Sequence, residues 1–220
     1  MVDLTRTRNR YPNLFQIHGP KISVRDILAK SKLEYTLVCF FSRLNILMYN
    51  SRCAFEVGNG LFMDYLLPKG KKQYVTDFPS IPVLPEDRIA RIPGDGNAAV
   101  TLTAGADIGR GVVWLLDQPH WDKYTYFRGE NTTWNKVLQE AEEIVGDKFK
   151  VEYVSFDKVD QAIKDAEGEP GNVWKLLAAE YDRAFARGQV ALPEGGFEKA
   201  EKRTSVRELL RSGYADIVPS

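Results

Sequence analysis

The stretch Glu34–Pro68 reads EYTLVCFFSRLNILMYNSRCAFEVGNGLFMDYLLP, and it decides the fold. It opens on YTLV (Tyr35–Val38), whose β-branched and aromatic residues are typical of a buried strand. It closes on GNGLFMDYLLP (Gly58–Pro68), a glycine turn followed by an aromatic run. The apolar and basic segment between them follows neither the helical nor the strand period. The two ends therefore predict an α/β protein, and the middle segment requires its own explanation.

The sequence around this stretch alternates helical and strand patterns. Lys21–Leu33 has the spacing of a short amphipathic helix that leads directly into the strand, which is half of an α/β layer. A second helix is expected after the strand-like segment AVTLT (Ala99–Thr103), with Asp107 as its cap. The clearest helix follows the sequence NTT, with a threonine as its cap and Gly146 at its end. We therefore predict a mixed α/β fold that is richer in helix toward the C-terminus.

The composition excludes several classes of function. The 220 residues include 30 basic and 30 acidic side chains, so the formal net charge is zero, which argues against a nucleic-acid-binding protein. No apolar run reaches the roughly 18 residues of a membrane span, and the polar N-terminus has no signal-peptide core, so we expect a cytoplasmic protein. His18 and His120 lack a second ligand at helical spacing, and Cys39 and Cys53 match no metal or redox spacing. We expect no metal site and two reduced thiols.

The motif GDGNAA (Gly94–Ala99) superficially matches a dinucleotide-binding fingerprint. That fingerprint requires a strand before it and a helix directly after it, so that the pyrophosphate meets the helix N-terminus. Pro93 precedes the motif here and a β-rich segment follows it. This context favours a turn or hairpin over a phosphate loop.

Four motifs, in order along the chain, carry a resemblance to a known family. They are KISVRDILAKSKLEYTLV from Lys21, GNGLFMDYLLP from Gly58, GDGNAAVTLTAGADIGRGVVWLLDQP from Gly94 and FRGENTTWNKVLQEAEEIVGDKFKVEYVS from Phe127. All four resemble segments of the isoflavone reductase and NmrA-like group. The first is similar to that group's lysine followed by a helix and a Tyr-Thr strand, and the second to its Gly-x-Phe-x-x-Tyr turn. The third is similar to its hairpin and Asp-Ile-Gly helix, and the fourth to its substrate-side helix and the strand after it. This group belongs to the atypical short-chain dehydrogenases, and the likeness is strongest to filamentous-fungal members.

The resemblance implies a fold and a division of the chain. The fold would be α/β, with a partial NAD(P)-binding Rossmann-like doubly wound sheet and a helical C-terminal substrate domain. Residues 1–78 would be the remnant of the NAD(P)-binding domain, and residues 79–220 would be the substrate-side region.

The resemblance also implies a site. Lys21 would occupy the position of the catalytic lysine and contact the cofactor. From its place before the helix alone, it is a proton donor or acceptor, a residue that holds a hydride-transfer cofactor, or an ordinary surface lysine. Gly58, Asn59 and Gly60 would bind the cofactor NADPH beside the nicotinamide. Phe62 and Tyr65 would contact the substrate.

The implied activity is NADPH-dependent reduction of a small, often aromatic or polyketide-like metabolite in fungal secondary metabolism. The partner would be that small molecule, with neither nucleic acid nor membrane, and a homodimer is left open. Other members of the group bind the dinucleotide and act as redox-sensing regulators, so a non-catalytic regulator is the alternative. An inactive fragment is the third reading.

The chain departs from the family pattern in two ways. The N-terminal half with the Gly-x-x-Gly-x-x-Gly phosphate turn has no counterpart, so the resemblance implies an N-terminally truncated member. The family also runs directly from YTLV into GNGLFMDYL, and removing Val38–Glu56 restores that continuity. We hypothesise that Val38–Glu56 is a retained intron, because Val-Cys can be encoded by bases that resemble a fungal splice donor. The alternative is a genuine loop insertion, which the entropy of loop closure tolerates.

Overall fold

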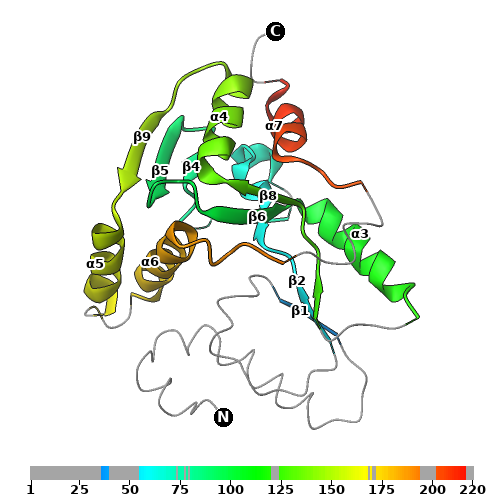
Figure 1. Cartoon of the computed structure of the whole chain (residues 1–220). Helices are drawn as coiled ribbons and strands as arrows, with labels where there is room; N and C mark the ends of the chain where they lie inside the picture. Colours follow the sequence, from blue (N-terminus) through cyan, green and yellow to red (C-terminus); the bar gives the residue numbers. More distant parts are fainter. Residues whose placement is uncertain are drawn as a thin grey trace, which may run out of the picture.

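The computed structural model describes residues 36–39, 55–72, 74–76, 78, 80–119, 124–167, 169, 172–193 and 202–216. The helix expected over Lys21–Leu33, Lys21 itself and most of the Val38–Glu56 segment lie outside the described residues. The described part is mixed α/β, as predicted, with three small sheets and helices packed around them (Figure 1).

The first sheet is parallel and contains both ends of the stretch Glu34–Pro68. Its strands are β1 (Thr36–Cys39), β2 (Phe55–Gly58) and β7 (Tyr124–Tyr126), in the order β1-β2-β7. Thr36 lies opposite Phe55 and Cys39 lies opposite Gly58, so β1 and β2 are direct neighbours. The predicted strand is β1, but the glycine turn is entered from β2. Because parallel sheets are built from crossover connections, this sheet agrees with the predicted Rossmann-like arrangement.

Two further sheets continue the fold. One consists of β3 (Leu61–Phe62), β6 (Ala99–Thr103) and β8 (Glu130–Thr133), and the other of β4 (Val83–Leu84), β5 (Ile89–Pro93) and β9 (Lys150–Val154). β6 is parallel to β3 and antiparallel to β8, whereas β5 is antiparallel to β4 and parallel to β9. Between β5 and β6, Gly94 and Gly96 have φ angles of 73° and 75°, and no helix follows them directly. The prediction that GDGNAA forms a turn is confirmed.

The helices lie on the flanks of these sheets (Figure 1). They are the short 3₁₀ helices η2 (Met63–Leu66) and η3 (Lys69–Lys71), followed by α3 (Gly105–Leu116), α4 (Trp134–Val145), α5 (Phe156–Glu167), α6 (Val173–Ala186) and α7 (Val206–Tyr214). The clearest predicted helix is confirmed as α4: the Thr133 side chain accepts a hydrogen bond from the Lys136 N–H, and Gly146 ends the helix with a left-handed φ of 75°. None of the helices in the described ranges combines the length and hydropathy needed to cross a bilayer.

The start of α3 differs from the prediction. Asp107 was expected to cap this helix, but α3 begins at Gly105 and its cap position is Ala104, which has no side-chain acceptor. The Asp107 carboxylate is buried and accepts hydrogen bonds from the Thr204 N–H at 2.7 Å and the Thr204 hydroxyl at 3.1 Å. The expectation was wrong because Asp107 lies within the first turn of α3, after the cap position, and its carboxylate binds Thr204 just before α7 instead of the start of its own helix.

The main hydrophobic core joins residues from distant parts of the chain. Leu61 and Met63 pack in one cluster with Trp134 of α4, Phe185 of α6 and Leu210 of α7. α3 covers a smaller cluster with Ile108, Leu115 and Phe127 at its centre. The main core therefore includes side chains from both sides of the predicted division at residues 78 and 79, and the division itself stays a prediction.

Candidate functional site

The predicted cofactor residues lie at the carboxyl end of the parallel sheet. β2 ends at Gly58, whose carbonyl oxygen accepts a hydrogen bond from the Phe127 N–H at 2.8 Å, so β2 and the segment after β7 stay together beyond the strands. Asn59 and Gly60 follow at this edge. In open α/β sheets ligands bind outside the carboxyl ends of the strands. The structure thus places Gly58, Asn59 and Gly60 where a dinucleotide would be expected, and their role in binding stays a prediction.

Asn59 contains a polar atom that the described fold does not satisfy. The side chain is fully buried, and its Nδ2 atom donates a long hydrogen bond to the Gly60 carbonyl at 3.3 Å. Among the described residues no group donates to its Oδ1 atom. A buried acceptor without a donor costs about 1–3 kcal/mol, so such an atom at the carboxyl end of a parallel sheet fits a donor from a bound ligand. The carboxamide of a nicotinamide ring offers such a donor, and the residues present therefore fit the cofactor.

Gly60 makes the turn after β2 possible. Its φ angle is 67°, a left-handed value that a residue with a side chain adopts at a cost of roughly 1–2 kcal/mol. A Cβ atom at this position would also lie 2.6 Å from the Thr101 carbonyl oxygen. This close approach brings β3 alongside β6 and sets the direction of Phe62 and Tyr65.

Phe62 and Tyr65, the predicted substrate residues, lie next to each other. Both are half-buried, and their ring centroids are 6.3 Å apart with the planes at 89°. Phe62 packs against the α3 cluster and Tyr65 against the main core. Burial, and to a smaller extent the neighbouring Asp64 carboxylate, raises the pKa of Tyr65. Its hydroxyl group therefore stays protonated at neutral pH and remains able to donate a hydrogen bond.

Tyr65 begins a row of aromatic side chains that sequence reasoning missed. Its ring lies 5.4 Å from that of Phe78, and Phe78 lies 4.7 Å from Tyr181 in an edge-to-face contact. Tyr181 continues to Phe185 at 5.9 Å. The members come from η2, the segment before β4, and α6, so their contact depends on tertiary structure. Nothing in the local pattern of the sequence indicates it.

Asp64 also has a role in the candidate site that the sequence did not indicate. It is buried between Met63 and Tyr65, and its Oδ2 atom accepts a hydrogen bond from the Gly105 N–H at 2.7 Å. Burial raises the pKa of Asp64, and the hydrogen bond from Gly105 partly opposes that rise. Because Asp64 supplies the acceptor that Ala104 lacks, it holds η2, and with it Tyr65, against the start of α3.

The chain is similar in sequence to named fungal proteins. No protein-family model matches the chain. The chain is 28% identical over 184 residues to a protein named oxidoreductase swnR from Arthroderma benhamiae, an alignment that covers 82% of this chain and 52% of that protein. It is 28% identical over 156 residues to the protein of the same name from Metarhizium robertsii, covering 69% of this chain and 45% of that protein. The chain spans about half the length of these curated relatives.

Solved structures of low sequence identity show the same arrangement. A nucleoside-diphosphate-sugar epimerase from Staphylococcus aureus has a TM-score of 0.61 at 18% identity, covering 87% of this chain and 70% of that one. A Citrobacter triphenylmethane reductase complexed with NADP(H) has a TM-score of 0.58 at 14% identity, covering 87% and 69%. Isoflavone reductase has a TM-score of 0.55 at 19% identity, covering 90% and 59%. The chain has the isoflavone-reductase fold. The resemblance predicted from the four motifs is thereby confirmed at the level of the fold.

Within the isoflavone-reductase fold, the structure brings together five of the six predicted site residues. Gly58 ends β2 and Asn59 and Gly60 follow it. Phe62 ends β3 and Tyr65 lies in η2, so all five come from one short segment of the chain. Lys21, the predicted catalytic lysine, lies outside the described residues, and its role stays a prediction.

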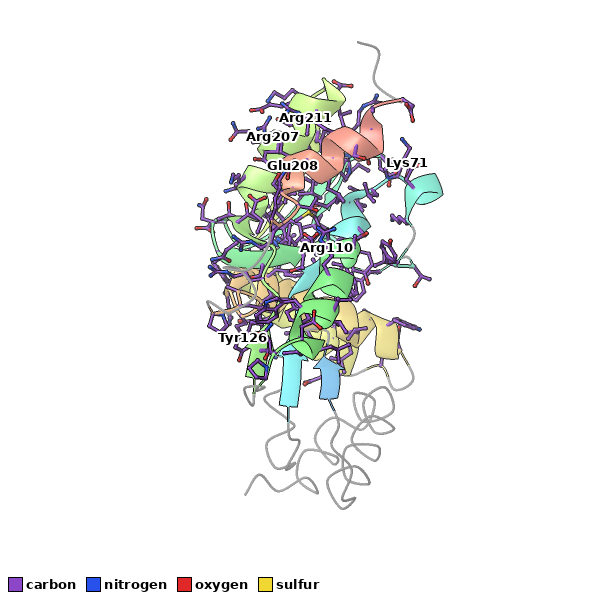
Figure 2. The ribbon with its side chains drawn as sticks, turned by 90° about the vertical axis from the view of Figure 1, so that its right-hand side faces the viewer. Lys71, Arg110, Tyr126, Arg207, Glu208 and Arg211 are labelled. Carbon is purple, nitrogen blue, oxygen red and sulfur yellow. The ribbon has the colours of Figure 1, made fainter. Side chains whose placement is uncertain are left out.

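A cleft between α4 and α7 is separate from this site. It has a volume of about 300 Å³ and is lined by Glu143, Ile144, Arg207, Arg211, Tyr214 and Ala215. Figure 2 shows Arg207 and Arg211 at the end of the molecule opposite Tyr126 of β7. Arg207 forms ion pairs with Glu143 at 2.6 Å and with Glu140 at 3.6 Å, which bind α7 to α4. The cleft is therefore a groove beside a structural ion-pair cluster, away from the carboxyl edge of the parallel sheet.

Proposed function

We propose that the chain is an NADPH-dependent oxidoreductase of the isoflavone-reductase type, which reduces a small aromatic or polyketide-like metabolite in the cytoplasm as part of fungal secondary metabolism. The observation that carries the proposal is the unsatisfied Oδ1 atom of Asn59, fully buried at the carboxyl edge of the parallel sheet. The isoflavone-reductase fold, the NADP(H)-bound structural neighbour and the oxidoreductase names of the fungal relatives support it.

The residues at the edge of the sheet have distinct tasks in this proposal. Gly58 and Gly60 let the backbone approach the cofactor closely, because neither carries a side chain. Asn59 accepts a hydrogen bond from the nicotinamide carboxamide and so fixes the orientation of the ring. Bound NADPH supplies the hydride. Lys21 protonates or orients the substrate, as its position in the family motif implies.

The aromatic row favours a flat, apolar substrate. Phe62 and Tyr65 are half-buried and meet edge to face, so each ring retains some surface that a ligand can cover. Aromatic rings in this arrangement bind other aromatic groups by stacking and by edge contacts. The Tyr65 hydroxyl, which is held protonated, can donate to a carbonyl oxygen of the substrate.

The proposal is tested by titrating NADPH into the chain by calorimetry, with an Asn59→Leu variant and a matched control. The control is Thr132→Val, because the Thr132 hydroxyl is also buried and without a described partner, but it lies on β8. Each substitution removes a buried unsatisfied group, so neither should lower the free energy of unfolding by more than about 1 kcal/mol. We expect Asn59→Leu to weaken NADPH binding about tenfold and Thr132→Val to leave it unchanged.

Two other results are informative. NADPH binding that needs Asn59, without turnover of any aromatic ketone or quinone in a broad panel, would favour the non-catalytic redox-sensing regulator. Absence of NADPH binding by a folded wild-type chain would overturn the proposal and favour the inactive fragment.

A further inference from the structure

β9 (Lys150–Val154) is the outer strand of its sheet, and its side chains are unusually exposed. The strand order β4-β5-β9 places it at the edge, and in Figure 1 it lies at the margin of the molecule with β5 on its inner side. Among the described residues no strand pairs with its outer edge. Val151 and Tyr153 are 37% and 51% exposed, and Phe156, just after the strand, is 46% exposed. The unpaired backbone N–H and C=O groups of such an edge strand are a template for pairing with another strand.

The direction of the backbone groups along β9 follows from its pairing with β5. The Lys150 N–H donates inward to the Arg88 carbonyl at 2.9 Å, and the Val154 carbonyl accepts from the Gly94 N–H at 2.8 Å. Because successive residues of a strand direct their N–H and C=O groups to opposite edges, Val151 and Tyr153 direct theirs outward. An added strand would therefore form its hydrogen bonds with Val151 and Tyr153.

The charged side chains of β9 are complementary to those of a second β9 that runs antiparallel to it. Lys150 and Glu152 flank Val151 and lie on the same face of the sheet, opposite Ile89 and Arg91 of β5. When a second β9 runs antiparallel with Val151 opposite Val151, each Lys150 lies opposite a Glu152. The same register pairs the outward N–H and C=O groups of the two Val151 residues. Placing Glu152 opposite Glu152 instead would bring two like charges together, which is destabilising.

We propose that β9 pairs with β9 of a second copy of this chain, antiparallel about a twofold axis at Val151. The two sheets then become one continuous six-stranded sheet, β4-β5-β9 followed by its copy in reverse order. The occupant of the edge is a second copy because the pattern Lys-Val-Glu is self-complementary only when it meets itself reversed.

Charge exchange tests this register. Lys150→Glu places two pairs of acidic residues across the axis, and Glu152→Lys places two pairs of basic residues there. We expect either change to raise the dissociation constant of the dimer about tenfold. The double variant Lys150→Glu with Glu152→Lys restores opposite charges and should dimerise like the wild type. Lys164→Glu on α5, the same change of charge away from the edge, is the matched control and should have no effect.

Mixing the two single variants gives the sharpest result. In a dimer of one Lys150→Glu chain with one Glu152→Lys chain, both cross-strand pairs are again oppositely charged, so the mixture should form heterodimers about as tightly as the wild type. Sedimentation velocity measures the self-association and native mass spectrometry identifies the heterodimer, while thermal unfolding confirms that each variant is folded. A wild-type chain that stays monomeric at all concentrations, or single variants that dimerise normally, would overturn the proposal. Failure of the mixture to pair would do so as well.

Discussion

The carboxylate of Asp64 caps a helix that begins 41 residues later in the chain: its Oδ2 atom accepts a hydrogen bond from the Gly105 N–H at 2.7 Å. The helix α3 has no acceptor of its own at its cap position, Ala104. The contact joins η2, which carries Tyr65, to the helix that follows β6. The geometry of the candidate substrate site therefore depends on Asp64, a residue that the sequence did not assign to that site.

Removing this contact should destabilise the fold. Asp64→Ala leaves the Gly105 N–H without its acceptor, and the loss of a helix cap costs about 1–2 kcal/mol. The free energy of unfolding from urea titration measures the loss. Asp117→Ala, at the exposed C-terminal end of the same helix, is the matched control and should change stability by less than about 0.5 kcal/mol. Equal effects of the two substitutions would show that the cap contributes nothing.

The raised pKa of Asp64 gives a distinct dependence on pH. Burial raises the pKa above its ordinary value of 3.8, so the folded chain holds this proton more tightly than the unfolded chain does. The stability linked to Asp64 is therefore full below pH 3.8 and is lost as the pH rises through the raised pKa. Asp64→Asn keeps an oxygen acceptor for Gly105 but cannot ionise. Relative to this variant, the wild type should lose stability as the pH rises from the acid range, as measured by urea unfolding at several pH values. A difference that does not vary with pH would contradict this.

Glu208 should show the opposite dependence on pH. Its carboxylate accepts a hydrogen bond from the Ser205 N–H at 3.0 Å and completes the capping box of α7. This bond, with Lys202 and the Ser205 hydroxyl adding to it, lowers the pKa of Glu208 from 4.5 to about 2. The stabilisation is therefore present above pH 4.5 and is lost as the pH falls through about 2. Glu208→Gln should remove this acid-dependent loss. Between these pH values, the free energies of unfolding of Glu208→Gln and of the wild type should become equal toward the acid end. A difference between the two that stays constant with pH would rule out the role of Glu208.

The contrast between α4 and α3 shows which parts of the structure the sequence could predict. For α4, the Thr133 cap, the apolar stripe through Trp134 and the Gly146 stop all lie within one segment, so each signal is local and all of them agree. For α3, the capping group is Asp64, which lies in a different segment and reaches Gly105 only through the pairing of β3 with β6. Local reasoning assigned the cap to Asp107 because no sequence pattern reports a contact formed by tertiary packing.

The same limit applies to the candidate site. The glycines and aromatic residues of GNGLFMDY could be assigned from their motif, because a turn and the residues after it are close in sequence. The unsatisfied Oδ1 atom of Asn59 could not be predicted, because whether a donor reaches this atom depends on all of its neighbours in the folded structure. The contact between Phe78 and Tyr181 joins segments about a hundred residues apart and is likewise a product of the complete fold.

Gly60 resists replacement for two reasons, its positive φ and the lack of space for a Cβ atom. A comparison with Gly70 and Gly146 distinguishes the two. Gly70 has open space around it and no positive φ, Gly146 has open space but a φ of 75°, and Gly60 has both a φ of 67° and a Cβ position 2.6 Å from the Thr101 carbonyl oxygen. Replacement by alanine should leave stability nearly unchanged at Gly70, cost about 1 kcal/mol at Gly146, and cost about 2–3 kcal/mol at Gly60. Chemical denaturation of the three variants tests the order. A Gly60→Ala variant no less stable than Gly146→Ala would mean that the approach to Thr101 is easily relaxed.

Tyr65 should affect turnover through its hydroxyl group rather than through the fold. Its raised pKa keeps the phenol protonated above its ordinary value of 10.0, so in the proposed reaction it donates a hydrogen bond to the substrate carbonyl throughout the neutral range. Tyr65→Phe keeps the ring contacts with Phe62 and Phe78 but removes the donor, which is worth about 1 kcal/mol. With an aromatic ketone or quinone that the wild type reduces, kcat/KM should therefore fall about fivefold while the melting temperature changes little. Tyr153→Phe removes a hydroxyl that donates to Asn135 at 3.0 Å on the exposed β9, and it should leave kcat/KM unchanged. Equal kcat/KM values for Tyr65→Phe and the wild type would remove Tyr65 from the site.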